Sequence, residues 1–173
     1  MRKIPKPAAG EYAPYAIMYI GLLPDDELVL DHLGGNLKII TDLVSILPEE
    51  RLVTPHAPGE WTIKDILVHC SDDERIYSYR ALRFARNDPI ELPGFDQELF
   101  AAYTGANQRT LQNILEEYAA VRSATITLFN NLPNDAFTRS GMANGHTMSV
   151  RAAVYHLAGH ELHHLNSIRQ NYL

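Results

Sequence analysis

The fold is decided by residues 63–86, which read IKDILVHCSDDERIYSYRALRFAR. Apolar side chains recur here at spacings of three and four, the pattern of an amphipathic helix with one buried face. Thr62, with Asp65 three residues later, resembles a capping box that opens this helix, and the Asn-Asp-Pro sequence after residue 86 ends it. His69 lies on the edge of the apolar face. The stretch therefore predicts a long helix that carries a histidine beside its buried surface.

Three further segments show the same helical periodicity. They are residues 24–47, residues 111–129 and residues 149–170. No segment shows the alternation of a strand. Four amphipathic helices of about 20 residues, each about 30 Å long, can bury their apolar stripes only against one another. We therefore expect an all-α fold, a four-helix bundle formed by residues 24–173.

The first 23 residues form a separate region of the sequence. Residues 1–23 are rich in proline and aromatic residues and cannot make a long helix. We expect them to wrap over the bundle as a proline-rich N-terminal arm. No apolar run in the chain indicates an export signal or reaches membrane-spanning length.

Composition narrows the class of protein. A chain of 173 residues is long enough for one well-buried core, so we expect one domain. The net charge of -6 provides no broad basic face for nucleic acid or for an anionic membrane. The single cysteine, Cys70, cannot form an internal disulfide, which fits a reducing compartment. These features favour a cytoplasmic protein with a small-molecule substrate.

Histidines are concentrated near the carboxyl end. His160 and His164 are four residues apart, so on a helix both imidazoles can converge on one ion. A third ligand must come from another helix, and His69 is the best candidate. We predict one divalent transition metal, and the ligands alone leave zinc, nickel, iron and manganese open, because imidazole suits several of these ions. Ordinary hydrogen-bonded histidines are the alternative, and the spacing leaves open whether His163 or His156 joins the site.

Residues 160–164 also fit the H-E-x-x-H motif of zinc proteases. Context argues against a protease, because residues 165–173 contain no histidine, aspartate or glutamate to act as a third ligand. The motif nevertheless makes Glu161 a candidate general base. Asp73, one turn beyond His69, is a second candidate, either as a base or as a carboxylate that orients an imidazole.

Several segments, in order, resemble the DinB-like superfamily and in particular its YfiT-type branch. They are residues 61–69, 73–76, 79–83, 92–96 and 158–164, and the resemblance covers about residues 25–173. It implies a four-helix bundle, often a homodimer, with nickel, zinc or a related ion on His69, His160 and His164. Such proteins include S-transferases that use bacillithiol, mycothiol or glutathione, a maleylpyruvate isomerase, and proteins described as metal-dependent hydrolases.

Three functions follow from a three-histidine metal site with an open coordination position. The first is an S-transferase, in which a low-molecular-weight thiol binds the ion as thiolate and attacks an electrophile. The second is a hydrolase of a small ester or amide, in which the ion lowers the pKa of a bound water and Glu161 or Asp73 accepts its proton. The third is a non-enzymatic protein that binds the metal or a small ligand. We rank them in this order.

Overall fold

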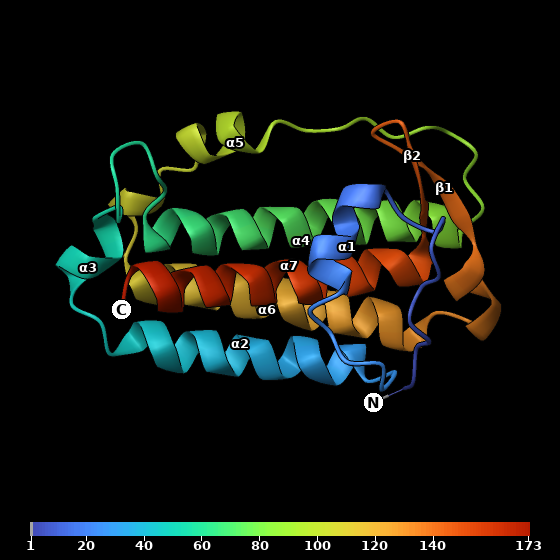
Figure 1. The fold of residues 1–173 in the computed structure, drawn as a ribbon, viewed down its shortest axis with the longest axis horizontal. Helices are drawn as coiled ribbons and strands as arrows, with labels where there is room; N and C mark the ends of the chain where they lie inside the picture. Colours follow the sequence, from blue (N-terminus) through green and yellow to red (C-terminus); the bar gives the residue numbers. More distant parts are fainter. Residues whose placement is uncertain (1) are drawn as a thin grey trace.

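The computed structural model describes residues 2–173, so the first residue of the expected arm lies outside it. Four long helices pack side by side (Figure 1), namely α2 (Val29–Ser45), α4 (Ile63–Ala85), α6 (Leu111–Asn131) and α7 (Val150–Asn171). Both α4 and α2 contact α6 and α7, and the interior between the helices is apolar. The expected all-α four-helix bundle is confirmed.

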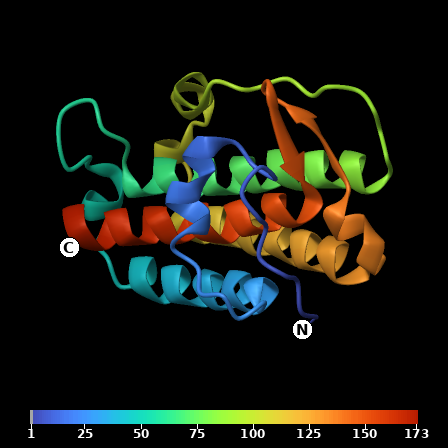
Figure 2. The same cartoon turned by 45° about the vertical axis from the view of Figure 1, so that its right-hand side comes forward.

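The four long helices do not simply alternate in direction along the chain. Colours in Figure 1 show that α4 and α6 run in one direction, whereas α2 and α7 run in the other. Because α4 and α6 are parallel, the chain must return along the bundle between them. Residues 86–110 form this crossover, which is visible above α4 in Figure 2. The crossover carries α5 (Gln97–Tyr103) and the short 3-10 helix η2 (Ala106–Gln108), neither of which the periodicity predicted.

Three of the long helices begin with a side-chain cap. Thr62 and Asp65 form the predicted capping box of α4, because each side chain accepts the other residue's backbone N–H. Ser149 caps α7 and Thr110 caps α6 in the same way through their hydroxyl groups. Such a cap contributes about 1 kcal/mol to helix stability. The first helix differs from expectation, because it begins at Val29 rather than near residue 24.

A short chain reversal separates α2 from the next long helix. After α2 the chain forms α3 (Glu49–Val53), a separate short helix that contacts α4.

Among residues 2–173, none of the helices is both long and apolar enough to cross a bilayer.

The expectation of no strand is wrong for residues 140–149. Strands β1 (Ser140–Ala143) and β2 (His146–Ser149) form an antiparallel hairpin. Asn144 and Gly145 make its turn with φ of 52° and 74°, the left-handed conformation that a two-residue hairpin requires. Leu92 of the crossover pairs with β1, since its N–H donates to Met142 at 2.9 Å. The hairpin thereby holds the crossover against the end of α4.

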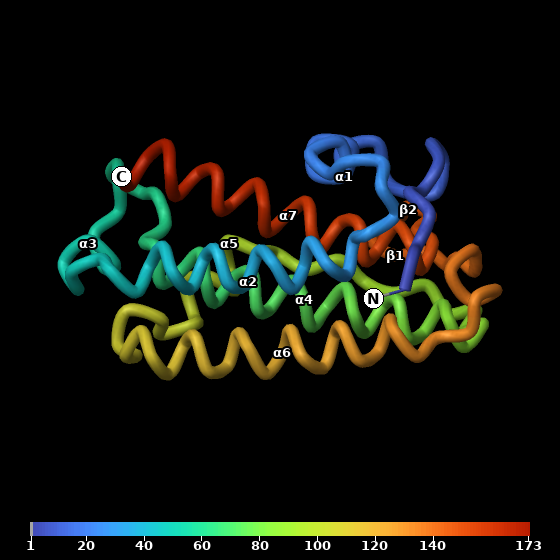
Figure 3. The backbone as a smooth tube through the Cα atoms, turned by 90° about the horizontal axis from the view of Figure 1, so that it is seen from below, coloured from blue at the N-terminus to red at the C-terminus, as the bar shows by residue number. Residues whose placement is uncertain are grey.

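Most of the N-terminal arm lies on the α7 side of the bundle (Figure 3), and the Arg2 guanidinium at its start donates to the carbonyl of Leu132 at the end of α6. It contains a short 3-10 helix, η1 (Pro14–Ala16), and α1 (Ile17–Ile20), which contacts α7. A Cβ atom at Gly159 would lie 2.2 Å from the carbonyl oxygen of Tyr19, so only glycine permits this close approach. The middle of the arm is held by Glu11, whose carboxylate accepts hydrogen bonds from Ser149 and Arg151. The arm thus covers the helix that carries the histidine cluster.

Candidate metal centre

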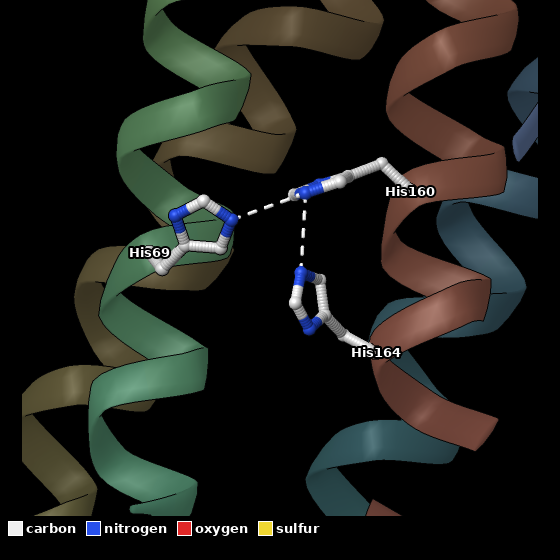
Figure 4. Close-up of side chains that lie close together, drawn as sticks. All are labelled: His69, His160 and His164. Carbon is white, nitrogen blue, oxygen red and sulfur yellow. Dashed lines mark hydrogen bonds between the residues drawn. The ribbon is translucent and has the colours of Figure 1, made fainter. Parts of the chain in front are cut away.

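Three histidines from two helices meet inside the bundle (Figure 4). His69 comes from α4, and His160 and His164 come from successive turns of α7. The Nε2 atom of His160 lies 3.1 Å from Nε2 of His69 and 3.1 Å from Nε2 of His164. His69 and His160 are 4% and 5% exposed. The structure therefore brings together the three residues that the sequence selected as ligands.

The protonation state of the three imidazoles favours the binding of a cation between them over hydrogen bonds from ring to ring. Nδ1 of His160 lies 3.4 Å from a carboxylate oxygen of Asp73, which favours a proton on Nδ1 and a lone pair on Nε2. Burial lowers the pKa of His160 to about 3, and burial also lowers the pKa of His69 and of His164. Neutral imidazoles present lone pairs to a metal. Metal–nitrogen bonds of about 2.0–2.1 Å in a tetrahedron separate the nitrogens by about 3.3 Å, close to the spacing observed. The cluster is compatible with a divalent metal ion.

Asp73 lies behind the cluster, on the far side of the His160 ring. Its Oδ2 atom is 3.4 Å from His160 Nδ1 and 3.4 Å from Nε2 of His156. Burial opposes the charge of Asp73, but the neighbouring imidazoles of His160 and His156 lower its pKa below the ordinary value. A carboxylate in this position orients a ligand imidazole and increases its basicity. Asp73, His156 and His160 also form a second group with ligand atoms close enough for an ion.

The two histidines left open by the sequence lie outside the set of three. His156 stacks on Tyr77, with ring centroids 3.8 Å apart and an interplanar angle of 5°, and it faces Asp73. The ring of His163 packs edge-on against Tyr19 at 5.4 Å. Neither belongs to the group formed by the three Nε2 atoms.

The structure does not bring Glu161 to the histidines. Successive helix residues point about 100° apart, so Glu161 faces a different neighbour from His160. Its Oε1 atom accepts hydrogen bonds from Arg122 at 2.7 Å and from the hydroxyl of Tyr118. Arg122 also pairs with Glu74. The role expected of Glu161, a base beside the metal, therefore loses its geometric basis, although the H-E-x-x-H string is present.

Two aromatic side chains border the cluster, and the sequence did not indicate either as part of it. Trp61, at the start of α4, has its ring 4.6 Å from the ring of His69 and stacks at 6.3 Å from His164. Tyr19, from the arm, lies 5.1 Å from the ring of His160. These rings limit the access of water to the histidines. The position of Trp61 directly before the capping box of α4 is a sequence signal that could have identified it as a residue beside the cluster.

A cavity of about 290 Å³ adjoins the cluster. It extends between the arm, α4, α7, the crossover and the hairpin tip, and its wall includes His160 and Asp73. Its dimensions suit a small organic molecule. Tyrosines contribute much of the remaining lining, namely Tyr15, Tyr19 and Tyr77.

Known proteins resemble this chain in sequence and in fold. A sequence model of the DinB superfamily matches residues 33–168. Among solved structures, YfiT from Bacillus subtilis superposes with a TM-score of 0.70 at 18% sequence identity, over 95% of this chain and 90% of that chain. YfiT is described as "a probable metal-dependent hydrolase with an unusual four-helix bundle topology". No curated protein sequence matches the chain significantly.

Proposed function

Because the chain belongs to the DinB superfamily, we propose that it is a metal-dependent enzyme with one divalent transition metal, nickel or zinc, on His69, His160 and His164. The observation that supports this proposal is the convergence of three Nε2 atoms in the protein interior, with the carboxylate of Asp73 behind the central ring. A metal held by three histidines keeps a coordination position open and supplies Lewis-acid chemistry to the atom bound there.

The reaction that we infer transfers a low-molecular-weight thiol, of the bacillithiol, mycothiol or glutathione type, to an electrophile. A carbon–sulfur bond forms, the leaving group departs with its electron pair, and the thiol proton passes to solvent. A thiol has a pKa of about 8.5 and ionises without a strong base. That requirement suits this site, because the carboxylate of Glu161 is engaged by Arg122 and that of Asp73 faces two imidazoles.

The protein's own side chains would position the reactants. Asp73 holds His160 so that its Nε2 atom faces the other two ligands. Trp61 and Tyr19 restrict the entry of water, which favours attack by the thiol over hydrolysis of the electrophile. The adjoining cavity accommodates the organic part of a substrate.

A fluorogenic electrophile tests the proposed transfer. Purified protein loaded with nickel or zinc is incubated with monochlorobimane and each candidate thiol, and the rate above the uncatalysed reaction is measured. We expect His160→Ala to lose the metal-dependent rate. The matched control is His163→Ala, on the same helix and outside the three-histidine group, which keeps it. Equal rates for wild type and His160→Ala would rule out the transfer mechanism.

Hydrolysis of a small ester or amide is the second candidate, and one observation favours it. Glu98 of α5 accepts a hydrogen bond from Trp61 at 3.1 Å, which brings an exposed carboxylate toward the His69 side of the cluster. Such a carboxylate can serve as a general base. A panel of chromogenic esters and amides tests this candidate, and metal-dependent turnover that falls in Glu98→Gln would favour it over transfer. A thermal shift on chelation without turnover on any panel would instead indicate a non-enzymatic metal-binding protein.

A further inference from the structure

Arg80 occupies the same face of α4 as the centre. His69, Asp73, Tyr77 and Arg80 follow one another at intervals of four, four and three residues, the spacing of neighbours on one helix face. The cavity beside the cluster is lined at one end by Asp73 and His160 and also by Arg80. The cavity therefore extends from His160, one of the three histidines, and Asp73 to a guanidinium group, while His69 and His164 are not part of its lining.

Among residues 2–173, the guanidinium of Arg80 has no charged partner. Arg80 is 5% exposed, and its Nη2 atom donates to the carbonyl of Pro93 at 2.9 Å. Its guanidinium carbon lies 4.9 Å from the centroid of the Tyr77 ring. Within residues 2–173, no carboxylate oxygen lies within 4.0 Å of its nitrogens, whereas the equally buried Arg122 pairs with two carboxylates. A buried charge without a counter-ion is costly.

Amide and aromatic side chains contribute most of the rest of the cavity lining, and its one carboxylate, in the described part of the chain, is that of Asp73. Gln97 and Asn144 contribute amide side chains to the cavity, so Arg80 carries the one positive side chain in its lining, apart from the histidines, among the residues described. Asn144 reaches this place from the hairpin tip, packed closely over Gly94. The Pro93 carbonyl and the Tyr77 ring hold the guanidinium in place before a ligand arrives, which lowers the entropic cost of binding.

We propose that Arg80 binds an oxyanion of the substrate, a carboxylate or a phosphate, while the reacting end of the same molecule lies at the three histidines. The proposal rests on the metal centre proposed above. A planar guanidinium recognises such groups through two parallel hydrogen bonds. Eleven residues separate His69 from Arg80, which is about 16 Å along the helix axis. The substrate is therefore an elongated anion rather than a compact neutral molecule.

Thiol probes that differ only in their far end test this proposal. Protein loaded with cobalt is titrated with mercaptoundecanoic acid, with mercaptoundecanol and with mercaptoundecyl phosphate, and thiolate binding is followed by the thiolate-to-cobalt absorption band. We expect an anionic probe to bind wild type at least about tenfold more tightly than the alcohol. The preferred anion identifies the oxyanion, and the shorter mercaptohexanoic acid, which should lose the preference, tests the span.

Substitutions assign the preference to one residue. Arg80→Met should remove the preference for the anion, and Arg80→Lys, which keeps the charge but not the planar fork, should retain part of it. Arg83→Met is the matched control, because Arg83 lies on the same helix and pairs with Asp88 outside the cavity. Circular dichroism checks that each variant is folded.

The outcomes separate this proposal from the metal centre on which it rests. Equal affinity of wild type for the acids, the phosphate and the alcohol would overturn the role of Arg80 while leaving the centre intact, and this comparison requires no variant. An unchanged preference in a folded Arg80→Met protein would overturn it as well. If cobalt gives no thiolate band with any probe, the proposed centre is wrong and the inference fails with it.

Discussion

Two polar clusters lie on different faces of the same stretch of α7. His160 belongs to the histidine centre, whereas its neighbour Glu161 belongs to a buried cluster with Glu74, Tyr118 and Arg122. In the buried cluster the charges are paired within the protein, since Arg122 Nε lies 2.9 Å from Glu74 and Arg122 Nη2 lies 2.7 Å from Glu161. The histidine side is different, because three imidazole Nε2 atoms converge there and the carboxylate beside them, that of Asp73, faces two imidazoles rather than an arginine.

The difference indicates which cluster serves the structure and which serves a ligand. Buried polar groups are normally satisfied by the protein itself, so an unsatisfied group requires an explanation. The paired cluster has one such atom, Oε2 of Glu161, and burial raises the pKa of this carboxyl. On the histidine side the unsatisfied atom, Oδ2 of Asp73, belongs to a residue that lines, with His160, a cavity extending to Arg80. We interpret the paired cluster as a core element and the histidine side as the binding region.

The largest expected effect comes from breaking the paired cluster. Arg122→Met should lower the free energy of unfolding by about 3–5 kcal/mol, because Glu74 and Glu161 remain buried without their counter-ion. Urea denaturation measures the change. The control, Arg75→Met, removes ion pairs exposed to solvent and should cost less than about 1 kcal/mol. A loss as small as that of the control would contradict the structural role.

Metal binding to the three histidines should change the free energy of unfolding by a smaller amount. Nickel or zinc at about 100 times its dissociation constant should raise the free energy of unfolding by about 2.7 kcal/mol, and a chelator should reverse the gain. The gain should disappear in His160→Ala and persist in His163→Ala. Thermal denaturation with and without metal provides the measurement. Stabilisation that survives in His160→Ala would place the ion elsewhere.

The orienting role of Asp73 predicts an intermediate effect. Asp73→Asn should weaken metal affinity by about 10–100-fold, because the carboxylate no longer holds the ring of His160. Competition with a chromogenic chelator measures the affinity. Asp72→Asn changes the adjacent carboxylate, which pairs with Arg75 at the surface, and should leave the affinity unchanged. If the two variants bind metal alike, Asp73 does not support the centre.

The smallest effect concerns the contact that holds the arm over α7. Hydrogen bonds from Arg151 outweigh burial and lower the pKa of Glu11 from 4.5 to about 2. The folded pKa is below the unfolded value, so this stabilisation is present above pH 4.5 and is lost as the pH falls toward 2. The contact is partly exposed, and Glu11→Gln should cost about 1 kcal/mol at pH 7.

Unfolding at several pH values distinguishes the arm contact from a general effect of charge. The difference between wild type and Glu11→Gln should shrink progressively below pH 4.5. Glu50→Gln removes an exposed carboxylate on α3 and serves as the control, with little change at any pH. A constant difference between wild type and Glu11→Gln across this range would show that the carboxylate charge does not hold the arm.

Local signals in the sequence predicted much of the bundle and selected the three histidines that meet. The stripes of apolar residues and the capping box of Thr62 and Asp65 depend on residues a few positions apart, and both are present. The i, i+4 spacing of His160 and His164 likewise depends on one helix. The hairpin was missed although Asn144-Gly145 is a strong turn signal, because the flanking residues do not alternate between apolar and polar.

Other features could not be predicted because they depend on contacts between distant segments. The H-E-x-x-H string pointed to Glu161 as a base, but the position of Arg122 on α6, 39 residues earlier, decides that its carboxylate faces the core. No local pattern in the sequence predicts that Arg80 is buried. It is buried because the crossover at Leu92 pairs with β1 and places Pro93 over the guanidinium.

By itself the sequence determined where helices begin and which of their faces are apolar, because caps and periodicity act within one or two turns of chain. It also determined that two imidazoles share a face of the last helix. The tertiary structure alone decided the directions of the four helices, the partner of each buried charge, and the connection of Arg80 to the histidine centre. These depend on packing between segments far apart in the chain, which no local pattern records.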